Sequence, residues 1–96
     1  MLKIFKIKGN SLYPLYLDGQ LVVCIKVYKF YKLKTNNVIV FSKEGYGQMI
    51  KRIEKIVDDK YFVQGTGIDS IDSRDFGLVA LEDISYKVIY KVKIFK

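Results

Sequence analysis

Three short segments of this chain combine side chains that could do chemistry, and they stand out because they are small, polar or glycine-containing where the rest is apolar. They are residues 9–14 (Gly-Asn-Ser-Leu-Tyr-Pro), residues 47–52 (Gly-Gln-Met-Ile-Lys-Arg) and residues 65–77, which are rich in Gly, Asp and Ser. Together they offer a hydroxyl, an amine and an ion pair that could orient the amine, a combination that can support nucleophilic catalysis. Each segment taken alone also fits a purely structural role.

The first segment offers the Ser11 hydroxyl as a nucleophile. Gly9 permits close approach of the backbone to a ligand, and Pro14 stiffens the end of the turn, so the hydroxyl between them is expected to lie exposed on a rigid turn. The alternative is that Ser11 is an ordinary turn residue.

The second segment offers Lys51 as a base. It lies between Ile50 and Ile53. If it is buried, desolvation disfavours the charged form and lowers its pKa from about 10.4, which gives a neutral amine able to take a proton from a serine. The alternative is an exposed lysine whose apolar stem covers the protein surface.

The third segment contains Ser70, Asp72 and Arg74. One interpretation is an ordinary loop in which Asp72 and Arg74 form a salt bridge. The functional interpretation is that the same ion pair and the hydroxyl groups orient the lysine amine.

Composition excludes several other kinds of site. The chain has no His and one Cys, which excludes Ser-His-Asp and Cys-His catalysis, imidazole-based zinc sites and intramolecular disulfides. A general base must therefore be Lys, Asp, Glu or Tyr. No cofactor and no metal is expected.

Length and charge predict one domain over residues 1–96 with a formal net charge of +7. The excess of lysine lies toward the two ends, and only Arg52 and Arg74 carry a guanidinium, so solvated strand faces explain the charge better than nucleic-acid recognition does. No apolar run approaches the roughly 20 residues of a membrane span. We therefore expect a soluble protein, either cytoplasmic or peripheral to a membrane.

In their order and combination the segments resemble the conserved boxes of the type I signal peptidase family of serine peptidases. Residues 9–14 resemble the nucleophile box Gly-x-Ser-Met-x-Pro, with Leu12 in place of methionine, and residues 37–41 resemble the strand after the Gly-Asp-Ile-Val motif. Residues 50–53 match the box of the general-base lysine, and residues 70–77 match the Ser-x-Asp-Ser-Arg-x-x-Gly box. The resemblance runs from about residue 7 to residue 89.

The resemblance implies a serine endopeptidase, with a Ser/Lys dyad, that removes a signal sequence or propeptide from a protein precursor. Ser11 would be the nucleophile and Lys51 the general base. The family pattern assigns the remaining site residues to the nucleophile and oxyanion loop (Gly9, Asn10, Ser11), to support of the dyad (Ser70, Asp72, Arg74) and to substrate contact (Leu12, Tyr13, Pro14). The expected partner is a precursor or peptide, with peripheral membrane contact as an open option and no nucleic acid.

Two other functions stay open. One is a non-catalytic or self-processing regulatory module on the same fold. The other is a basic β-barrel that binds single-stranded nucleic acid through three aromatic residues interleaved with four lysines. These residues are Tyr28, Phe30 and Tyr31 with Lys26, Lys29, Lys32 and Lys34.

The elements that must position these residues are predicted to be strands. Alternating or β-branched runs indicate strands over residues 20–28, 37–41, 61–63, 76–81 and 86–95. Residues 48–57 have apolar residues at helical spacing, but they lack a capping residue at their start, and with the family resemblance we predict a long strand. The expected fold is mostly β, with small curled antiparallel sheets or a barrel-like domain.

Overall fold

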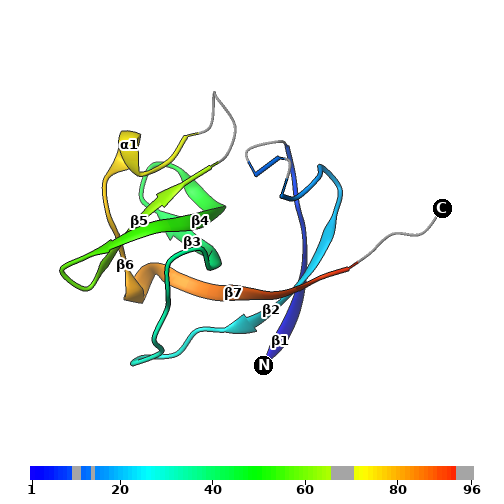
Figure 1. The fold of residues 1–96 in the computed structure, drawn as a ribbon, viewed down its shortest axis with the longest axis horizontal. Helices are drawn as coiled ribbons and strands as arrows, with labels where there is room; N and C mark the ends of the chain where they lie inside the picture. The colour runs from blue at the N-terminus through cyan, green and yellow to red at the C-terminus, as the bar shows by residue number, and fades with distance from the viewer. Residues whose placement is uncertain (10–11, 14, 66–70, 93–96) are drawn as a thin grey trace.

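The computed structural model describes residues 1–9, 12, 13, 15–65 and 71–92. In these residues the chain forms seven strands, one short α-helix and one 3-10 helix (Figure 1). In chain order they are β1 (Leu2–Lys6), β2 (Leu21–Lys26), β3 (Val38–Lys43), β4 (Gly47–Val57), β5 (Lys60–Gln64), α1 (Ser73–Phe76), β6 (Val79–Ala80), η1 (Leu81–Asp83) and β7 (Ile84–Lys91). The prediction of a mostly β fold is confirmed.

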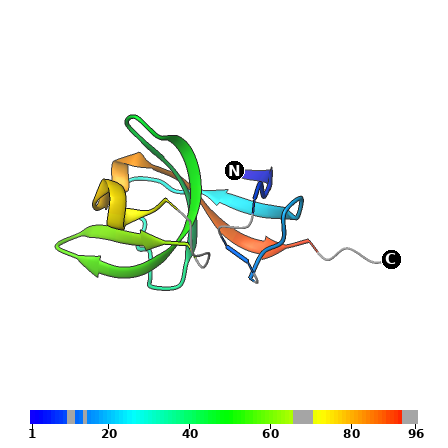
Figure 2. The same ribbon diagram turned by 90° about the horizontal axis from the view of Figure 1, so that it is seen from above.

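The strands form one antiparallel sheet in the order β1-β2-β7-β3-β4-β5-β6. β7 joins two lobes, because it pairs with β2 along one part of its length and with β3 along another. The sheet is strongly curled, as the two views in Figures 1 and 2 show. It is open, with β1 and β6 at its edges, so the curled antiparallel architecture is confirmed without closure into a barrel.

β3 is the centre of the packing, because residues 38–41 are all buried. Successive side chains of a strand point to opposite faces, so this continuous apolar run is what a strand covered on both faces requires. Ile39 and Phe41 belong to one hydrophobic core, and Val40 belongs to the other. The first core also contains Val27, Leu33, Ile53, Tyr61, Val63, Val79 and Ile84, and the second also contains Ile7, Val22 and Cys24.

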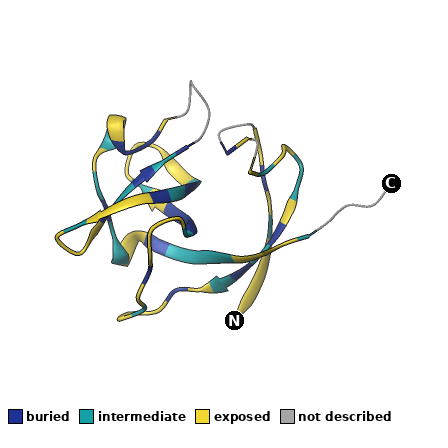
Figure 3. Ribbon diagram, in the orientation of Figure 1, coloured by how far each residue is buried: buried dark blue, intermediate teal, exposed yellow. Residues whose placement is uncertain are grey.

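The edge strand β1 is much more exposed than the centre of the sheet (Figure 3). The sequence did not predict this strand. Its five residues, Leu-Lys-Ile-Phe-Lys, are exposed except for the half-buried Phe5.

None of the helices in the described part of the chain has the length and apolar character that a membrane crossing requires.

β4 is a strand despite the helical spacing of its apolar residues, as predicted. Residues 49–53 in its middle are buried or half-buried on both faces, and a bulge between Ile53 and Lys55 shifts the alternation in its second half. The strand ends in a tight hairpin in which Asp58 and Asp59 both have positive φ, a conformation that Asp tolerates better than most residues.

The predicted strand over residues 76–81 is wrong at both ends. Phe76 ends α1 and Leu81 begins η1, which leaves only Val79–Ala80 in the sheet. The apolar character of the segment reflects packing of Phe76 and Leu81 against the first core, and not strand alternation. The predicted strands over residues 20–28 and 86–95 correspond to the shorter β2 and β7, and residues 93–96 lie outside the described part.

Candidate functional site

Lys51 is buried because of the register between β3 and β4. Its cross-strand partner is Ile39, a fully buried residue of the first core. Directly opposed residues share a face of the sheet, so the Lys51 side chain projects on the same side as Ile39 and Ile53. Only 5% of Lys51 is exposed to solvent. This is the environment that the catalytic interpretation of Lys51 requires.

The surroundings of Lys51 favour its neutral form. Burial lowers its pKa below the ordinary value of 10.5, and the negative charges of Asp72 and Asp75 offset only part of this effect. Among the described residues the Lys51 amine makes no hydrogen bond and no ion pair. An amine that is desolvated and unpaired in this way is suited to accept a proton.

The Asp72 carboxylate is fully buried and accepts several hydrogen bonds. Arg74 donates from Nε at 2.9 Å and from Nη2 at 2.7 Å, and the Gly65 N–H donates at 3.3 Å. Burial alone would raise the pKa of Asp72, but these hydrogen bonds and the Arg74 charge outweigh it and hold the pKa below 3.8. The predicted Asp72–Arg74 ion pair is confirmed.

Asp72 also caps α1, which fixes the helix next to the sheet. Its carboxylate accepts a hydrogen bond from the Arg74 N–H, and the Asp75 carboxylate accepts one from the Asp72 N–H. These reciprocal bonds form a capping box. The Ser73 hydroxyl then accepts a hydrogen bond of 2.8 Å from the Val63 N–H of β5. Because β5 pairs with β4, the two carboxylates lie close enough for their charges to act on Lys51.

The loop predicted to hold the nucleophile is fixed at its base. Asn10, Ser11 and Pro14 lie outside the described residues, as does Ser70. At the base, the Ile7 N–H donates to the Gln20 carbonyl and the Gly19 N–H donates to the Ile7 carbonyl, both at 2.7 Å.

A further bond within this loop joins its two arms. The Gly9 N–H donates to Asp18 Oδ1 at 2.8 Å. Gly9 has a φ of +80°, which explains why glycine suits this position.

The residues predicted to contact substrate differ in their exposure. Leu12 is 1% exposed, so it packs in the interior. In this conformation it cannot contact a substrate. Tyr13 is 54% exposed.

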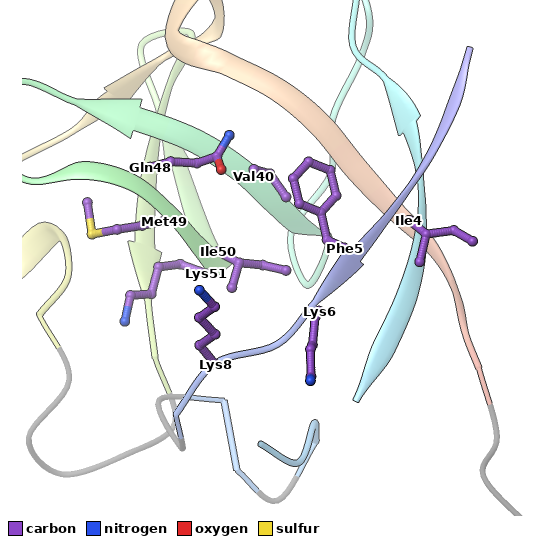
Figure 4. A pocket seen from close by; sticks show the side chains of 9 residues that line it. All are labelled: Ile4, Phe5, Lys6, Lys8, Val40, Gln48, Met49, Ile50 and Lys51. Carbon is purple, nitrogen blue, oxygen red and sulfur yellow. The ribbon is translucent and has the colours of Figure 1, made fainter. Parts of the chain in front are cut away.

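A cavity of about 520 Å³ lies between β1 and β4 (Figure 4). Its walls combine apolar and cationic side chains from these two strands and the start of the loop after β1, with one residue of β3. They are Ile4, Phe5, Lys6, Lys8, Val40, Gln48, Met49, Ile50 and Lys51. Figure 4 shows Phe5 and Ile50 facing the cavity and the Lys8 side chain extending toward β4.

The cavity brings the start of the nucleophile loop to the same walls as Lys51. Lys8 lines it and precedes Ser11 by three residues.

Sequence reasoning missed three residues of this region. Lys8 gave no signal, because nothing in its local sequence distinguishes it from other exposed lysines. Ser73 and Asp75 lie in a recognised box, but their roles as the anchor to β5 and as the partner in the capping box were not predicted. The spacing Asp72-x-x-Asp75 is typical of a helix start and could have indicated α1.

No family model and no curated protein matches the chain. In the described part of the chain no group of three or more His, Cys, Asp or Glu residues is placed to hold a metal ion. The chemistry of the site must therefore be argued from its own side chains.

We expect Asp72→Ala to destabilise the fold by about 2 to 3 kcal/mol at pH 7, because it removes a helix cap and leaves the buried Gly65 N–H without this acceptor. The stabilisation requires the ionised carboxylate. It should be complete above about pH 5 and decline as the pH falls below 3.8 toward the lower pKa of the folded state.

Urea unfolding of wild type and variant between neutral and acidic pH measures this difference. Asp83→Ala is a matched control, because it also removes one carboxylate but from an exposed position. A pH-independent difference for Asp72→Ala, or an equal effect of Asp83→Ala, would contradict the assignment.

Proposed function

We propose that this chain is a serine endopeptidase of the signal peptidase type, in which a Ser11/Lys51 dyad cleaves a signal sequence or propeptide from a protein precursor. The observation that carries the proposal is the state of Lys51, which is 5% exposed and has a lowered pKa. A desolvated and unpaired amine of this kind reduces the stability of a small domain, and catalysis as a base gives it a role that offsets this cost. The resemblance of four sequence boxes to that family supplies the reaction class.

In the proposed reaction Lys51 begins as a neutral amine. It takes the proton from the Ser11 hydroxyl while Ser11 Oγ forms a bond to the scissile carbonyl carbon. When the tetrahedral intermediate collapses, the C–N bond breaks and the Lys51 ammonium gives its proton to the leaving amine. A water molecule then attacks the resulting ester with Lys51 again as base, which releases the acid product and restores Ser11.

The negative charge on the carbonyl oxygen needs a hydrogen-bond donor. The backbone N–H of Ser11 would serve, as the family pattern implies. Gly9 has no side chain that could add a hydroxyl donor. The bond between Gly9 and Asp18 and the base of the loop hold the chain up to Gly9 in place, so Asp18 is a positioning residue in this scheme.

The cavity between β1 and β4 is suited to an extended peptide. β1 is an edge strand of the described sheet, so a substrate segment can add to it through main-chain hydrogen bonds. Phe5, Val40 and Ile50 offer apolar contact to a substrate side chain. Lys6 and Lys8 make the same cavity unfavourable for a basic side chain.

The dyad is tested by cleavage of synthetic peptides that span signal-sequence and propeptide junctions, followed by mass spectrometry. We expect Ser11→Ala and Lys51→Met each to lower kcat/KM by at least about a hundredfold, because each removes a group that acts in the transition state. Lys55→Met is the matched control, since Lys55 lies exposed on the same strand. Cleavage by either dyad variant at the wild-type rate would refute the proposal.

The pH dependence of cleavage should follow the neutral fraction of Lys51. We expect kcat/KM to rise with pH and to level off at a pH below 10.5, the ordinary lysine value, because burial lowers the pKa of this amine. A pH–rate profile of the free enzyme measures the midpoint. A midpoint at or above the ordinary value would show that Lys51 does not act as a desolvated base.

Stability gives a readout that is separate from activity. The pKa of Lys51 is lower in the folded state, so the unfolded chain binds more protons and wild-type stability should rise as the pH increases through this pKa toward 10.5. Lys51→Met should therefore be more stable than wild type at pH 7, by about 1 kcal/mol or more. Thermal unfolding of both proteins measures the difference. A less stable Lys51→Met would mean that the amine supports the fold.

A further inference from the structure

The turn after β2 exposes two aromatic side chains to solvent. It spans residues 28–31 and is closed by a hydrogen bond of 3.0 Å from the Tyr31 N–H to the Tyr28 carbonyl. We call it the aromatic turn. Phe30 is 83% exposed and Tyr28 is 56% exposed. Large exposed apolar groups that lie together at a turn commonly mark an interaction site.

The backbone of the aromatic turn does not favour phenylalanine. Phe30 is the third residue of the turn and has a φ of +73°, in the left-handed region. Glycine or asparagine adopts this conformation more readily at that position of a turn, and a bulky residue is strained there. Neither the backbone conformation nor burial explains why a phenylalanine occupies this position. The explanation must therefore be a contact between its ring and another molecule.

The chain on both sides of the aromatic turn is rich in lysine. Lys26, Lys29, Lys32 and Lys34 are all exposed. The sequence contains no acidic residue between Asp18 and Glu44. In space Glu82 of η1 lines a pocket together with Tyr28 and Lys29. The four lysines outnumber this carboxylate, so the charge beside the apolar tip favours an anionic surface.

We propose that the aromatic turn is a membrane-contact site that inserts Phe30 and Tyr28 into the headgroup region of an anionic lipid bilayer. Aromatic rings at this depth are stabilised by contact with the acyl boundary, and lysines beside them are attracted to anionic lipid. A turn that projects two rings can enter a bilayer surface, and the lysine stems are long enough to keep their charges at the headgroups.

The same features are less suited to other macromolecules. The centres of protein interfaces are depleted of lysine, whereas four lysines surround this turn. Bases of a single-stranded nucleic acid need open ring faces for stacking. Here Lys29 Nζ lies 5.3 Å from the centre of the Phe30 ring, and Lys26 Nζ lies 5.7 Å from that of Tyr28.

The position of the aromatic turn determines how the molecule would be oriented on a bilayer. In Figure 1 the aromatic turn lies at the lower edge of the molecule, whereas α1 and the loop after β1 lie at the upper edge. A bilayer bound at the lower edge leaves the candidate site facing the aqueous phase. The site would then meet parts of a protein that project from the membrane into water.

Sedimentation with lipid vesicles tests the proposal. We expect the full chain to bind vesicles of phosphatidylcholine mixed with phosphatidylserine and to bind pure phosphatidylcholine vesicles far more weakly. Each lysine at the surface should contribute about fivefold, so Lys29→Gln combined with Lys32→Gln should weaken binding by about 25-fold. Lys6→Gln combined with Lys8→Gln removes the same charge from the walls of the cavity, and should have a much smaller effect.

Phe30→Asn separates the role of the ring from folding. It should weaken vesicle binding several-fold while it raises the thermal midpoint, because asparagine relieves the left-handed backbone. Tyr90→Ala is the control, since Tyr90 is 57% exposed on β7, and it should leave binding unchanged.

Three results would overturn the proposal. They are equal or absent binding to both kinds of vesicle, equal losses for the two lysine pairs, and unchanged vesicle binding by Phe30→Asn. Binding of a single-stranded oligonucleotide that Phe30→Asn abolishes, with no loss of vesicle binding, would assign the turn to nucleic acid instead.

Discussion

The pairing of β3 with β4 is the constraint on which the candidate site depends. It places Lys51 opposite Ile39, on the face of the sheet that the first core covers. A lysine in this register loses most of its hydration, and its charged form becomes less favourable. The buried Asp72 carboxylate is held near it by α1 and β5 and limits the shift without cancelling it. The register therefore produces a desolvated amine, and the Asp72 carboxylate that pairs with Arg74 also caps α1.

The same pairing explains why a chain of 96 residues folds around two small cores. β3 is buried on both faces, so Ile39 contributes to one core and Val40 to the other. β4 repeats this division, since Lys51 lies on the first face and Ile50 packs against the second core. The strong curl of the sheet brings β1 across from β4 and opens a cavity between them. The amine thus lies where the packed part of the molecule meets this cavity.

Sequence patterns predicted the strands best where burial follows a simple rule. The continuous apolar run of β3 and the alternation of β7 both indicated strands correctly. The pattern of β4 imitated a helix, because both faces are covered and a bulge after Ile53 changes its phase. The pattern over residues 76–81 misled, since Phe76 and Leu81 reach the core from helical turns. The spacing of apolar residues indicates which residues are buried. It also indicates whether the backbone is a strand or a helix, but only when one face of the element is covered.

The sequence by itself determined the chemistry that is open to this protein. The absence of histidine left Lys, Asp, Glu or Tyr as a possible base, and the family resemblance pointed to Lys51. The closeness of Asp72 and Arg74 along the chain was enough to predict their ion pair. Only the tertiary structure decided that Lys51 is buried, that Leu12 is a packing residue and that Lys8 shares a cavity with Lys51. The reason is physical: an ion pair between near neighbours depends on local geometry, whereas desolvation depends on contacts between strands that are far apart in the sequence.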